Sequence, residues 1–414
     1  MPIHYRINGM VYRFSESITL LFWFFFIFFI YTDIPIFFGS LIIPGFISVG
    51  LSILILFHIY KFFESRDFKL FMQIVVIVLS SMFCGGSYFL GVYALLPKLI
   101  QLFVAFFTGL VTFKAIELTS KKIIVKVFWA LFAFILIGTL LEKYGIIRPI
   151  TTLYADLLFS GSGYSPATNK QIRDLSLVGF SRPLFFTSEP SLVAIGFYIV
   201  SISLFFLTTK LSYKIFIFFS TLLFLSIIGS PIVLINLFFL IICLLNNSSI
   251  KFKLILLFST FFLFYSLVSS SIVSRINSEI QNSNTSIYVR VVYPYFEILP
   301  YSLINKPFLG FGFGGRDVFL QSRYGQGVTT EHVSLDFTEG ANAFVRLILY
   351  LGLFGTIAVF WAFINFCNIG GRANIFLFVI CWFLLAQTLG TFETVRFWGY
   401  TFILLSVITR KKES

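Results

Sequence analysis

Charged residues are scarce in this sequence: only 11% of its 414 residues are Asp, Glu, Lys or Arg. Soluble globular proteins carry about 25% of such residues. A chain with so little charge cannot cover a folded surface with side chains that water solvates well, so a soluble globular protein is excluded. The net charge of +13 does not indicate nucleic-acid binding either, because the basic residues are not clustered on a polar domain.

Histidine and cysteine are also rare, and this excludes several kinds of site. His4, His58 and His332 are too far apart in the sequence to predict a zinc site. The four cysteines all lie in or at the ends of apolar segments, at Cys84, Cys243, Cys367 and Cys381. No CxxC, HExxH, Walker lysine, nucleophile elbow or DxD pair occurs. We therefore expect no metal, no cofactor and no disulfide, and a metal-dependent nucleotide-sugar enzyme is disfavoured.

Apolar residues are what the chain has in abundance: they make up 58% of it, with 59 phenylalanines and a mean hydropathy of +0.97. About 20 consecutive apolar residues suffice for a transmembrane helix. Apolar runs bounded by charge, Gly or Pro lie near 17–31, 36–60, 68–83, 92–113, 123–141, 190–209, 213–229, 231–245, 254–270, 342–366, 374–390 and 397–409. The sequence predicts an all-α polytopic membrane protein, with about twelve transmembrane helices in a single integral membrane domain, 1–414.

The positions of the basic residues predict the orientation. With a cytoplasmic N-terminus, more than half of the 30 Lys and Arg residues fall on the inner side, most of them within a few residues of a helix end. The segments 142–189 and 271–341 then form two long loops on the outer side, and both termini are cytoplasmic. The two outer loops are nearly neutral overall, so an anionic substrate would have to be recognised by a few placed arginines.

The first long loop ends in a segment that suits an anionic headgroup. Glu189-Pro190-Ser191 opens a predicted span, with Pro at a first helical position where its missing N–H costs nothing. Arg173 and Arg182 precede it. A planar guanidinium close to a helix N-terminus at the membrane surface suits a diphosphate. The alternatives are that Glu189 only complements the helix dipole and that Arg182 is an ordinary interfacial cation.

The second long loop carries Arg290 in a semi-apolar stretch that we expect to lie along the membrane interface as a helix. Glycines at 310, 312, 314 and 315 follow, between Lys306 and Arg316. A dinucleotide-binding fingerprint is disfavoured because no strand precedes these glycines in a βαβ unit. We expect a tight turn that lets the backbone approach a ligand or another helix.

The tenth predicted span, which follows this loop, begins with two polar residues. Asn342 and Arg346 are four residues apart, which places them on one helical face. An ionisable residue about one turn inside a span usually faces the bundle interior and marks a site, although Arg346 has the alternative of snorkelling to the interface. His332 is a candidate base, with a solvated loop histidine as the alternative.

Three stretches carry a resemblance to a known family: Gly179 to Ala194 with its Arg and Glu-Pro, Arg290 to the glycine-rich turn, and Asn342 to Gly355. Together with about twelve spans and two long outer loops, they resemble the bacterial O-antigen polymerase and O-antigen ligase superfamily. This resemblance implies a bacterial inner-membrane glycosyltransferase that uses undecaprenyl-diphosphate-linked oligosaccharides on the periplasmic face. Ligase-like members commonly carry a histidine directly before the matching asparagine, where this chain has Ala341, and this departure favours a polymerase.

The resemblance and the residue types together predict a reaction. Arg182 and Arg290 would clamp the diphosphate as the bond from the sugar C1 breaks, with Arg173 and Arg316 assisting. Glu189 or His332 would deprotonate the attacking hydroxyl of a second lipid-linked repeat unit. The substrate-binding candidates are Arg173, Arg182, Arg290, Arg316, Asn342 and Arg346. Expected partners are the lipid-linked oligosaccharide, the bilayer and a chain-length regulator protein, with no nucleic acid.

Other functions stay open at this stage. An O-antigen ligase would use the same donor, and a lipid-linked oligosaccharide flippase or another twelve-span transporter would need no catalytic base. A transporter is expected to have short loops on both faces and ionisable residues in the middle of its spans, which is not the pattern here. A structural scaffold of an envelope assembly complex would leave Arg182 and Arg290 dispensable.

Overall fold

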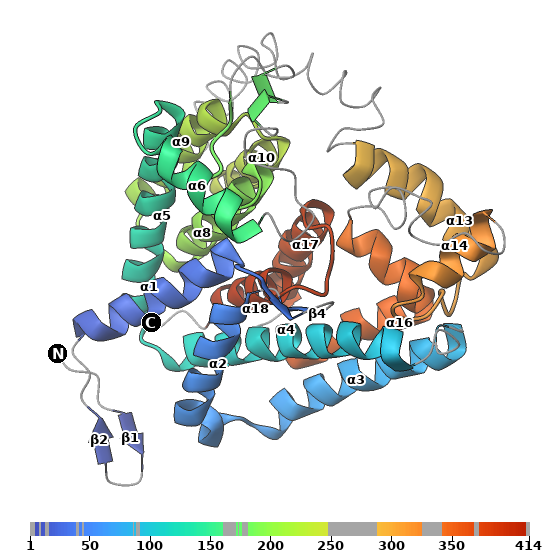
Figure 1. Ribbon diagram of the computed structural model, residues 1–414. Coiled ribbons are helices and arrows are strands. Elements are labelled where there is room, and N and C mark those ends of the chain that lie inside the picture. Colours follow the sequence, from blue (N-terminus) through green and yellow to red (C-terminus); the bar gives the residue numbers. More distant parts are fainter. Residues whose placement is uncertain are drawn as a thin grey trace. The chain divides into compact units, whose positions relative to one another are not determined.

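The computed structural model of the chain describes residues 5–7, 10–12, 16–38, 41–43, 45–85, 87, 92–159, 171–172, 174–175, 181–246, 288–324, 342–367 and 372–410. Figure 1 labels the helices and strands along the chain. The chain divides into two compact units. Unit 1 comprises Met1–Phe37, Gly45–Ser52 and Ala115–Ile272, and unit 2 comprises Phe38–Pro44, Ile53–Lys114 and Val273–Ser414.

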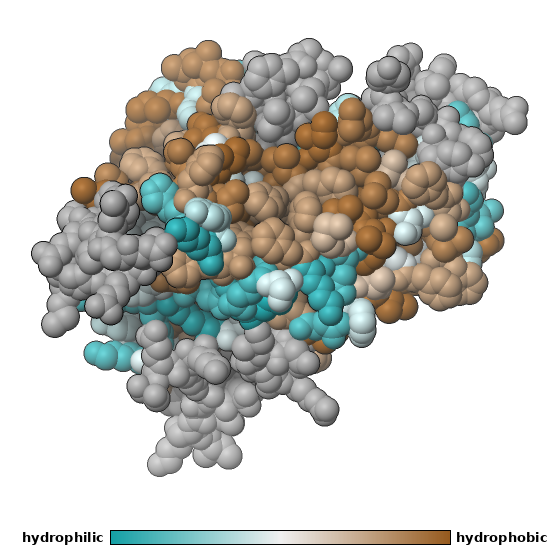
Figure 2. Space-filling view, turned by 90° about the horizontal axis from the view of Figure 1, so that it is seen from below, coloured by the Kyte–Doolittle hydropathy of each residue, from teal (hydrophilic) through white to brown (hydrophobic). Residues whose placement is uncertain are grey.

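Apolar helices dominate the described residues, as expected of a polytopic membrane protein. Six are long and apolar enough to cross a membrane: Ser65–Gly85 (α3), Leu95–Leu118 within α4, Lys121–Lys143 (α5), Pro190–Leu207 (α8), Leu211–Ile228 (α9) and Ala343–Phe366 within α16. Shorter apolar helices coincide with five more predicted spans: Glu16–Thr32 (α1), Phe46–Ile59 (α2), Pro231–Asn246 (α10), Arg372–Thr388 (α17) and Val395–Thr409 (α18). The predicted span 254–270 lies outside the described residues. Figure 2 shows apolar side chains over large areas of one face.

Unit 1 is built around α8, which packs against α5, α9 and α10, while α1 packs against α5. A helix that is apolar on all sides belongs in a core, and 89% of the residues of α8 are buried. The ring of Phe197 on α8 stacks on Phe224 of α9 with centroids 3.8 Å apart. Helix α9 ends at Gly229 in the left-handed conformation, and Pro231 starts α10. The predicted division of the long apolar run at 229–231 is confirmed.

Unit 2 pairs α3 with α16 and α17 with α18. Helix α4 (Val92–Leu118) contributes its residues up to Lys114. The ring of Phe106 on α4 lies 4.7 Å from Trp398 and 5.4 Å from Phe402, both on α18. The second long loop contributes the short helices Tyr288–Val292 (η4), Pro294–Ile298 (η5), Leu299–Asn305 (α13) and Arg316–Tyr324 (α14).

Helix α16 (Ala343–Cys367) is interrupted at Gly352, whose φ of 65° and ψ of −174° are not helical. The glycine-rich turn at 307–312 fills the interruption, and Gly310 and Gly312 in it have positive φ. Four backbone bonds of 2.8 to 3.1 Å join the two segments, with donor first: Phe311 to Leu349, Gly312 to Tyr350, Leu353 to Pro307 and Phe354 to Phe308. Non-helical backbone inside a membrane is tolerated where protein satisfies its polar groups. The turn thus approaches another helix, one of the two arrangements that we expected.

Two boundaries differ from the prediction. The run 36–60 is not one helix: Ile36–Phe38 (β3) and Leu41–Ile43 (β4) form a small hairpin, and α2 starts only at Phe46. Pro44 disfavours helical backbone in the residue before it, and Gly45 has a φ of 64°. A second hairpin pairs Tyr5–Ile7 (β1) with Met10–Tyr12 (β2).

Helix α4 also continues beyond the predicted end at 113, so that Lys114 lies inside it. This side chain is 2% exposed and was expected in a solvated inner loop. Its Nζ lies 3.1 Å from Glu64 Oε1 and 3.6 Å from Asp67 Oδ2. Hydrogen bonding to Lys114 holds the pKa of the Glu64 carboxyl below its usual value. The lysine therefore joins α4 to the start of α3 within unit 2.

Candidate functional site

The segment 181–189, which leads into α8, is held by contacts from three helices of unit 1. Glu142, at the end of α5, accepts hydrogen bonds from the N–H groups of Leu184 and Phe185, both at 2.8 Å. The hydroxyl of Tyr31 on α1 donates to the Phe185 carbonyl at 2.7 Å. Arg148, which begins helix α6 (Arg148–Phe159), donates to the Ser181 carbonyl at 3.0 Å. These contacts fix the backbone on both sides of the arginine.

The backbone of this segment adopts a conformation that it would not keep alone. Phe185 and Phe186 have φ values of 27° and 59°, which non-glycine residues rarely adopt. Such strain persists only where the surrounding structure imposes it, and it often accompanies functional segments. The ring of Phe185 packs directly against the bare backbone of Gly138 on α5, so the absence of a side chain there makes room for it.

Arg182 is held by a buried carboxylate. Its Nε and Nη2 donate to the two oxygens of Asp174 at 3.0 and 2.6 Å, and the two side chains are 8% and 1% exposed. A two-point contact of this kind fixes the plane of the guanidinium as well as its position. Asp174 occupies one edge of Arg182 and leaves other N–H donors of the same group for a further anion.

Glu189 is the residue directly before α8, and Pro190 is the first residue of the helix, as predicted. The Glu189 side chain makes no capping hydrogen bond to the helix backbone. Instead, the hydroxyl of Ser191 donates to Glu189 Oε2 at 3.1 Å, and Thr187 donates to the Glu189 carbonyl at 2.8 Å. The carboxylate thus stands at the positive end of α8 and is oriented by a neighbouring hydroxyl.

In unit 2 a cluster of neutral polar groups, Tyr295, Asn342 and Gln387, surrounds the start of α16. We call it the amide cluster. Gln387 Oε1 accepts from Tyr295 Oη at 2.6 Å and from Asn342 Nδ2 at 2.7 Å. Asn342 Nδ2 also donates to the Arg290 carbonyl at 2.9 Å. Asn342 Oδ1 accepts from the Val345 N–H at 3.1 Å and thereby caps α16.

The amide cluster joins three parts of the chain that are far apart in sequence. Asn342 is fully buried, and the backbone next to it is bonded to the end of α17, because the Ala343 N–H donates to the Leu389 carbonyl at 3.0 Å. Burial raises the pKa of the Tyr295 hydroxyl above its usual value, so this tyrosine stays a hydrogen-bond donor at neutral pH. The cluster therefore links the start of α16 to η4, to η5 and to the end of α17 by hydrogen bonds.

Two arginines, Arg290 and Arg346, lie on elements that contribute to the amide cluster, and a third, Arg396, follows α17 in the sequence. Arg290 lies on η4, and its backbone carbonyl is part of the cluster. Arg346 lies one turn into α16 on the face of Asn342, as predicted, and is half-buried. Arg396, 6% exposed, lies in the first turn of α18, just beyond the short connection from α17. Guanidinium groups are positively charged, and we refer to Arg290 and Arg346 as the basic region at the start of α16.

Arg316, the remaining described candidate, begins α14 directly after the glycine-rich turn and is half-buried. Arg173 and His332 lie outside the described residues. Arg182 belongs to unit 1, whereas Arg290, Arg316, Asn342 and Arg346 belong to unit 2. The diphosphate clamp formed by Arg182 and Arg290 therefore stays a prediction.

Sequence reasoning missed four residues of these two regions: Glu142, Asp174, Gln387 and Arg396. Gln387 and Arg396 carried the signal that identified Arg346, since each is a polar residue in or beside an apolar run. Glu142 and Asp174 looked like ordinary loop acids. Only the fold reveals that one accepts backbone N–H groups and the other orients Arg182.

No group of three or more His, Cys, Asp or Glu side chains suited to a metal ion lies among the described residues. Comparisons of the chain with protein-family models, with curated proteins and with solved structures find no match. Any assignment of function therefore depends on the residues themselves.

Proposed function

We propose that this protein is a membrane glycosyltransferase that polymerises undecaprenyl-diphosphate-linked oligosaccharide repeat units into O-antigen or a related surface polysaccharide, on the periplasmic face of a bacterial inner membrane. The observation that carries the proposal is the basic region at the start of α16. Arg290 lies on η4, whose backbone bonds to the buried Asn342, and Arg346 lies one turn into the helix that Asn342 caps. Basic groups at the end of apolar helices suit a ligand whose charged headgroup is attached to a lipid.

In this proposal the unit 2 arginines bind the diphosphate of the donor. The bond between the sugar C1 and the phosphate oxygen breaks, and the bonding electrons stay on the diphosphate leaving group. Fixed positive charge stabilises that developing charge most when water is excluded. The amide cluster holds the Arg290 backbone and the first turn of α16 in place, so little reorganisation is needed during the reaction.

The attacking hydroxyl belongs to the sugar of a second lipid-linked repeat unit, and it must lose its proton as the new glycosidic bond forms. Glu189 is the proposed base, with His332 as the alternative. A carboxylate that reaches the attacking hydroxyl can accept its proton as the new bond forms. Arg182, oriented by Asp174, is proposed to assist with the anionic part of the substrate.

One observation favours a second candidate, a flippase for lipid-linked oligosaccharides. Discontinuous helices with half-helix ends form substrate sites in many transporters, and α16 is discontinuous at Gly352. In this chain, however, the groups freed by the break are bonded to the turn at 307–312. This weakens the transporter reading, because a substrate would have to displace that turn.

Polysaccharide analysis in a deletion strain distinguishes these functions. We expect wild type to restore long chains and Arg290→Ala to leave single repeat units attached to the acceptor. Lys69→Ala, at an exposed lysine of α3 in the same unit, is the matched control and should restore long chains. Loss of all attached glycan would indicate a ligase instead, and lipid-linked units trapped inside the cell would indicate a flippase. Full-length chains with Arg290→Ala at normal protein levels would contradict the proposed role of this arginine.

A further inference from the structure

Helix α6, in the segment that we predicted to be the first long outer loop, exposes a stripe of large apolar side chains. Ile150, Leu153 and Leu157 are 61%, 60% and 70% exposed, and Ile146, just before the helix, is 66% exposed. Their spacing of three and four residues places them on one face. Single exposed apolar residues are common on protein surfaces, but a continuous stripe along a whole helix usually marks an interaction surface.

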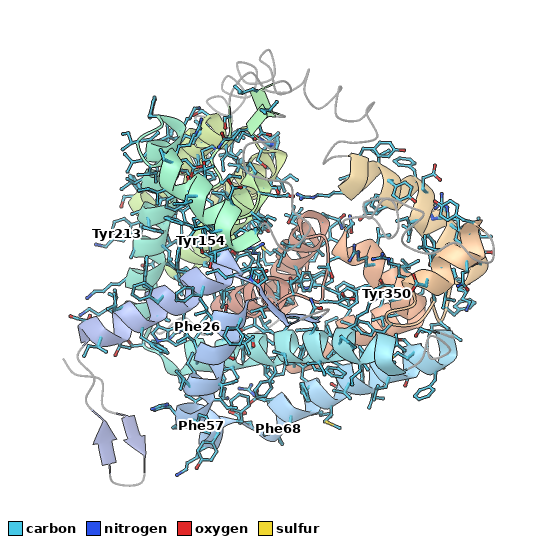
Figure 3. All side chains as sticks on the ribbon, viewed as in Figure 1. Phe26, Phe57, Phe68, Tyr154, Tyr213 and Tyr350 are labelled. Atoms are coloured by element: carbon cyan, nitrogen blue, oxygen red, sulfur yellow. The ribbon has the colours of Figure 1, made fainter. Side chains whose placement is uncertain are left out.

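The other faces of α6 have different surroundings. Ala155 and Phe159 are buried against Leu184 of the segment 181–189. Tyr154, labelled in Figure 3, packs edge-on against Phe186 with ring centroids 5.0 Å apart. On the flank between the buried and the apolar faces, Thr152 accepts a hydrogen bond from the Gln171 side chain at 3.1 Å, and Asp156 follows one turn later. Helix α6 thus has a protein face, a polar flank and an apolar face.

Two features identify what covers the apolar face. The stripe follows α5 directly in the sequence, α5 is one of the helices able to cross a membrane, and Ile137 on α5 and Tyr144 just after it are 55% and 74% exposed. Beside Asp174, Ile172 and Leu175 are also 66% and 53% exposed. A short helix that directly follows a spanning helix and carries an apolar face beside a polar flank fits the boundary between acyl chains and headgroups.

We infer that α6 is an interfacial membrane helix that inserts the face of Ile146, Ile150, Leu153 and Leu157 into the outer part of the bilayer. The helix packs with its opposite face on Leu184 and Phe186 and therefore anchors the segment 181–189 at headgroup depth. Such helices typically bury their apolar face about 5–10 Å into the headgroup and acyl boundary. The inference concerns lipid contact alone and holds whether or not the protein is a polymerase.

Fluorescence quenching in lipid nanodiscs tests this inference. The full-length chain, with its four native cysteines replaced by alanine, receives an environment-sensitive label at Leu153→Cys or, as a second test position, at Leu157→Cys. Asp156→Cys, on the polar flank of the same helix, is the matched control. We expect lipids with a spin label near the headgroup to quench labels at 153 and 157 more than lipids labelled at the chain end do. Aqueous iodide should quench the label at 156 and leave those two unaffected.

Two results would overturn the inference. Labels at 153 and 157 that iodide quenches and labelled lipids do not would show that the stripe faces water. Labels that resist both quenchers would show that protein, from a partner or a second copy of the chain, covers the stripe. Each labelled variant has to elute and unfold like the cysteine-free parent, and the two test positions make the result independent of a single poorly folded variant.

Discussion

The segment that leads into α8 and the start of α16 are held by different kinds of contact. Before α8, charged groups fix the chain: Asp174 binds Arg182 at two points, and Glu142 accepts two backbone N–H groups. At the start of α16, Asn342 forms hydrogen bonds with neutral groups, namely the Gln387 side chain and the backbone of Arg290 and Val345.

This difference separates stability from function. A buried charge that loses its partner destabilises the fold strongly, whereas the loss of a neutral hydrogen bond costs less. We therefore expect variants before α8 to damage folding first. Variants at the start of α16 should impair substrate binding while the protein stays folded.

The largest effect is expected at the Arg182 and Asp174 pair. Arg182→Ala leaves the 1%-exposed Asp174 side chain without this countercharge, and breaking a buried pair costs about 3–5 kcal/mol. The free energy of unfolding, or the thermal midpoint in detergent, should fall accordingly. The double variant Arg182→Met with Asp174→Leu should recover most of the loss, because apolar replacement of a buried pair is often neutral.

The same double variant distinguishes structure from substrate binding. If Arg182 assists the reaction as proposed, the stable double variant still produces shortened polysaccharide. Full-length polysaccharide from the double variant would show that Arg182 only stabilises unit 1. The segment before α8 would then serve stability, and the start of α16 would serve substrate binding.

A smaller loss of stability is expected at Glu142. Glu142→Gln keeps one acceptor oxygen for the N–H groups of Leu184 and Phe185 and leaves the other buried donor unsatisfied, at a cost of about 1–3 kcal/mol. Thermal unfolding in detergent measures this change. Glu117→Gln, an exposed acid at the end of α4, is the control and should shift the midpoint little. Equal shifts for both variants would contradict the role assigned to Glu142.

The smallest change in stability is expected at Asn342. Asn342→Ser retains a good helix cap but loses the donors to Arg290 and Gln387, so stability should fall by about 0.5–1.5 kcal/mol while polysaccharide length falls. Asn342→Ala also loses the cap, which costs about 0.5–2 kcal/mol. Thermal unfolding and polysaccharide gels of both variants separate the two effects. Polysaccharide of normal length with Asn342→Ser would show that the amide cluster is not needed for function.

Local signals predicted much of this fold. Eleven of the twelve predicted apolar runs coincide with the described helices or overlap them. The sequence predicted the break at Gly229 to Pro231 and the start of α8 at Pro190, because a turn glycine and a first-turn proline act through their own backbone. The placement of Asn342 and Arg346 on one face also followed from helical spacing alone.

Long-range contacts could not be predicted in this way. Nothing near Glu142 in the sequence indicates that a segment about forty residues later supplies two N–H groups. Gly352 lies in a continuous apolar run, and its interruption of α16 depends on the turn at 307–312. Helix α6 was not predicted because its apolar stripe is too short for a transmembrane span, although the sequence shows apolar residues spaced by three and four positions there.

The central claim is that the basic region at the start of α16 binds the diphosphate of a lipid-linked glycan during polymerisation. The direct measurement supplies lipid-linked repeat units, extracted from the deletion strain, to the purified protein in nanodiscs and follows glycan length and release of undecaprenyl diphosphate. Wild type should lengthen the glycan and release the carrier. Arg290→Ala should lower the rate by about 10²–10³, the usual cost of losing one stabilising donor, while the thermal midpoint stays unchanged. Failure of wild type to consume the substrate, or an undiminished rate with Arg290→Ala, would contradict the claim.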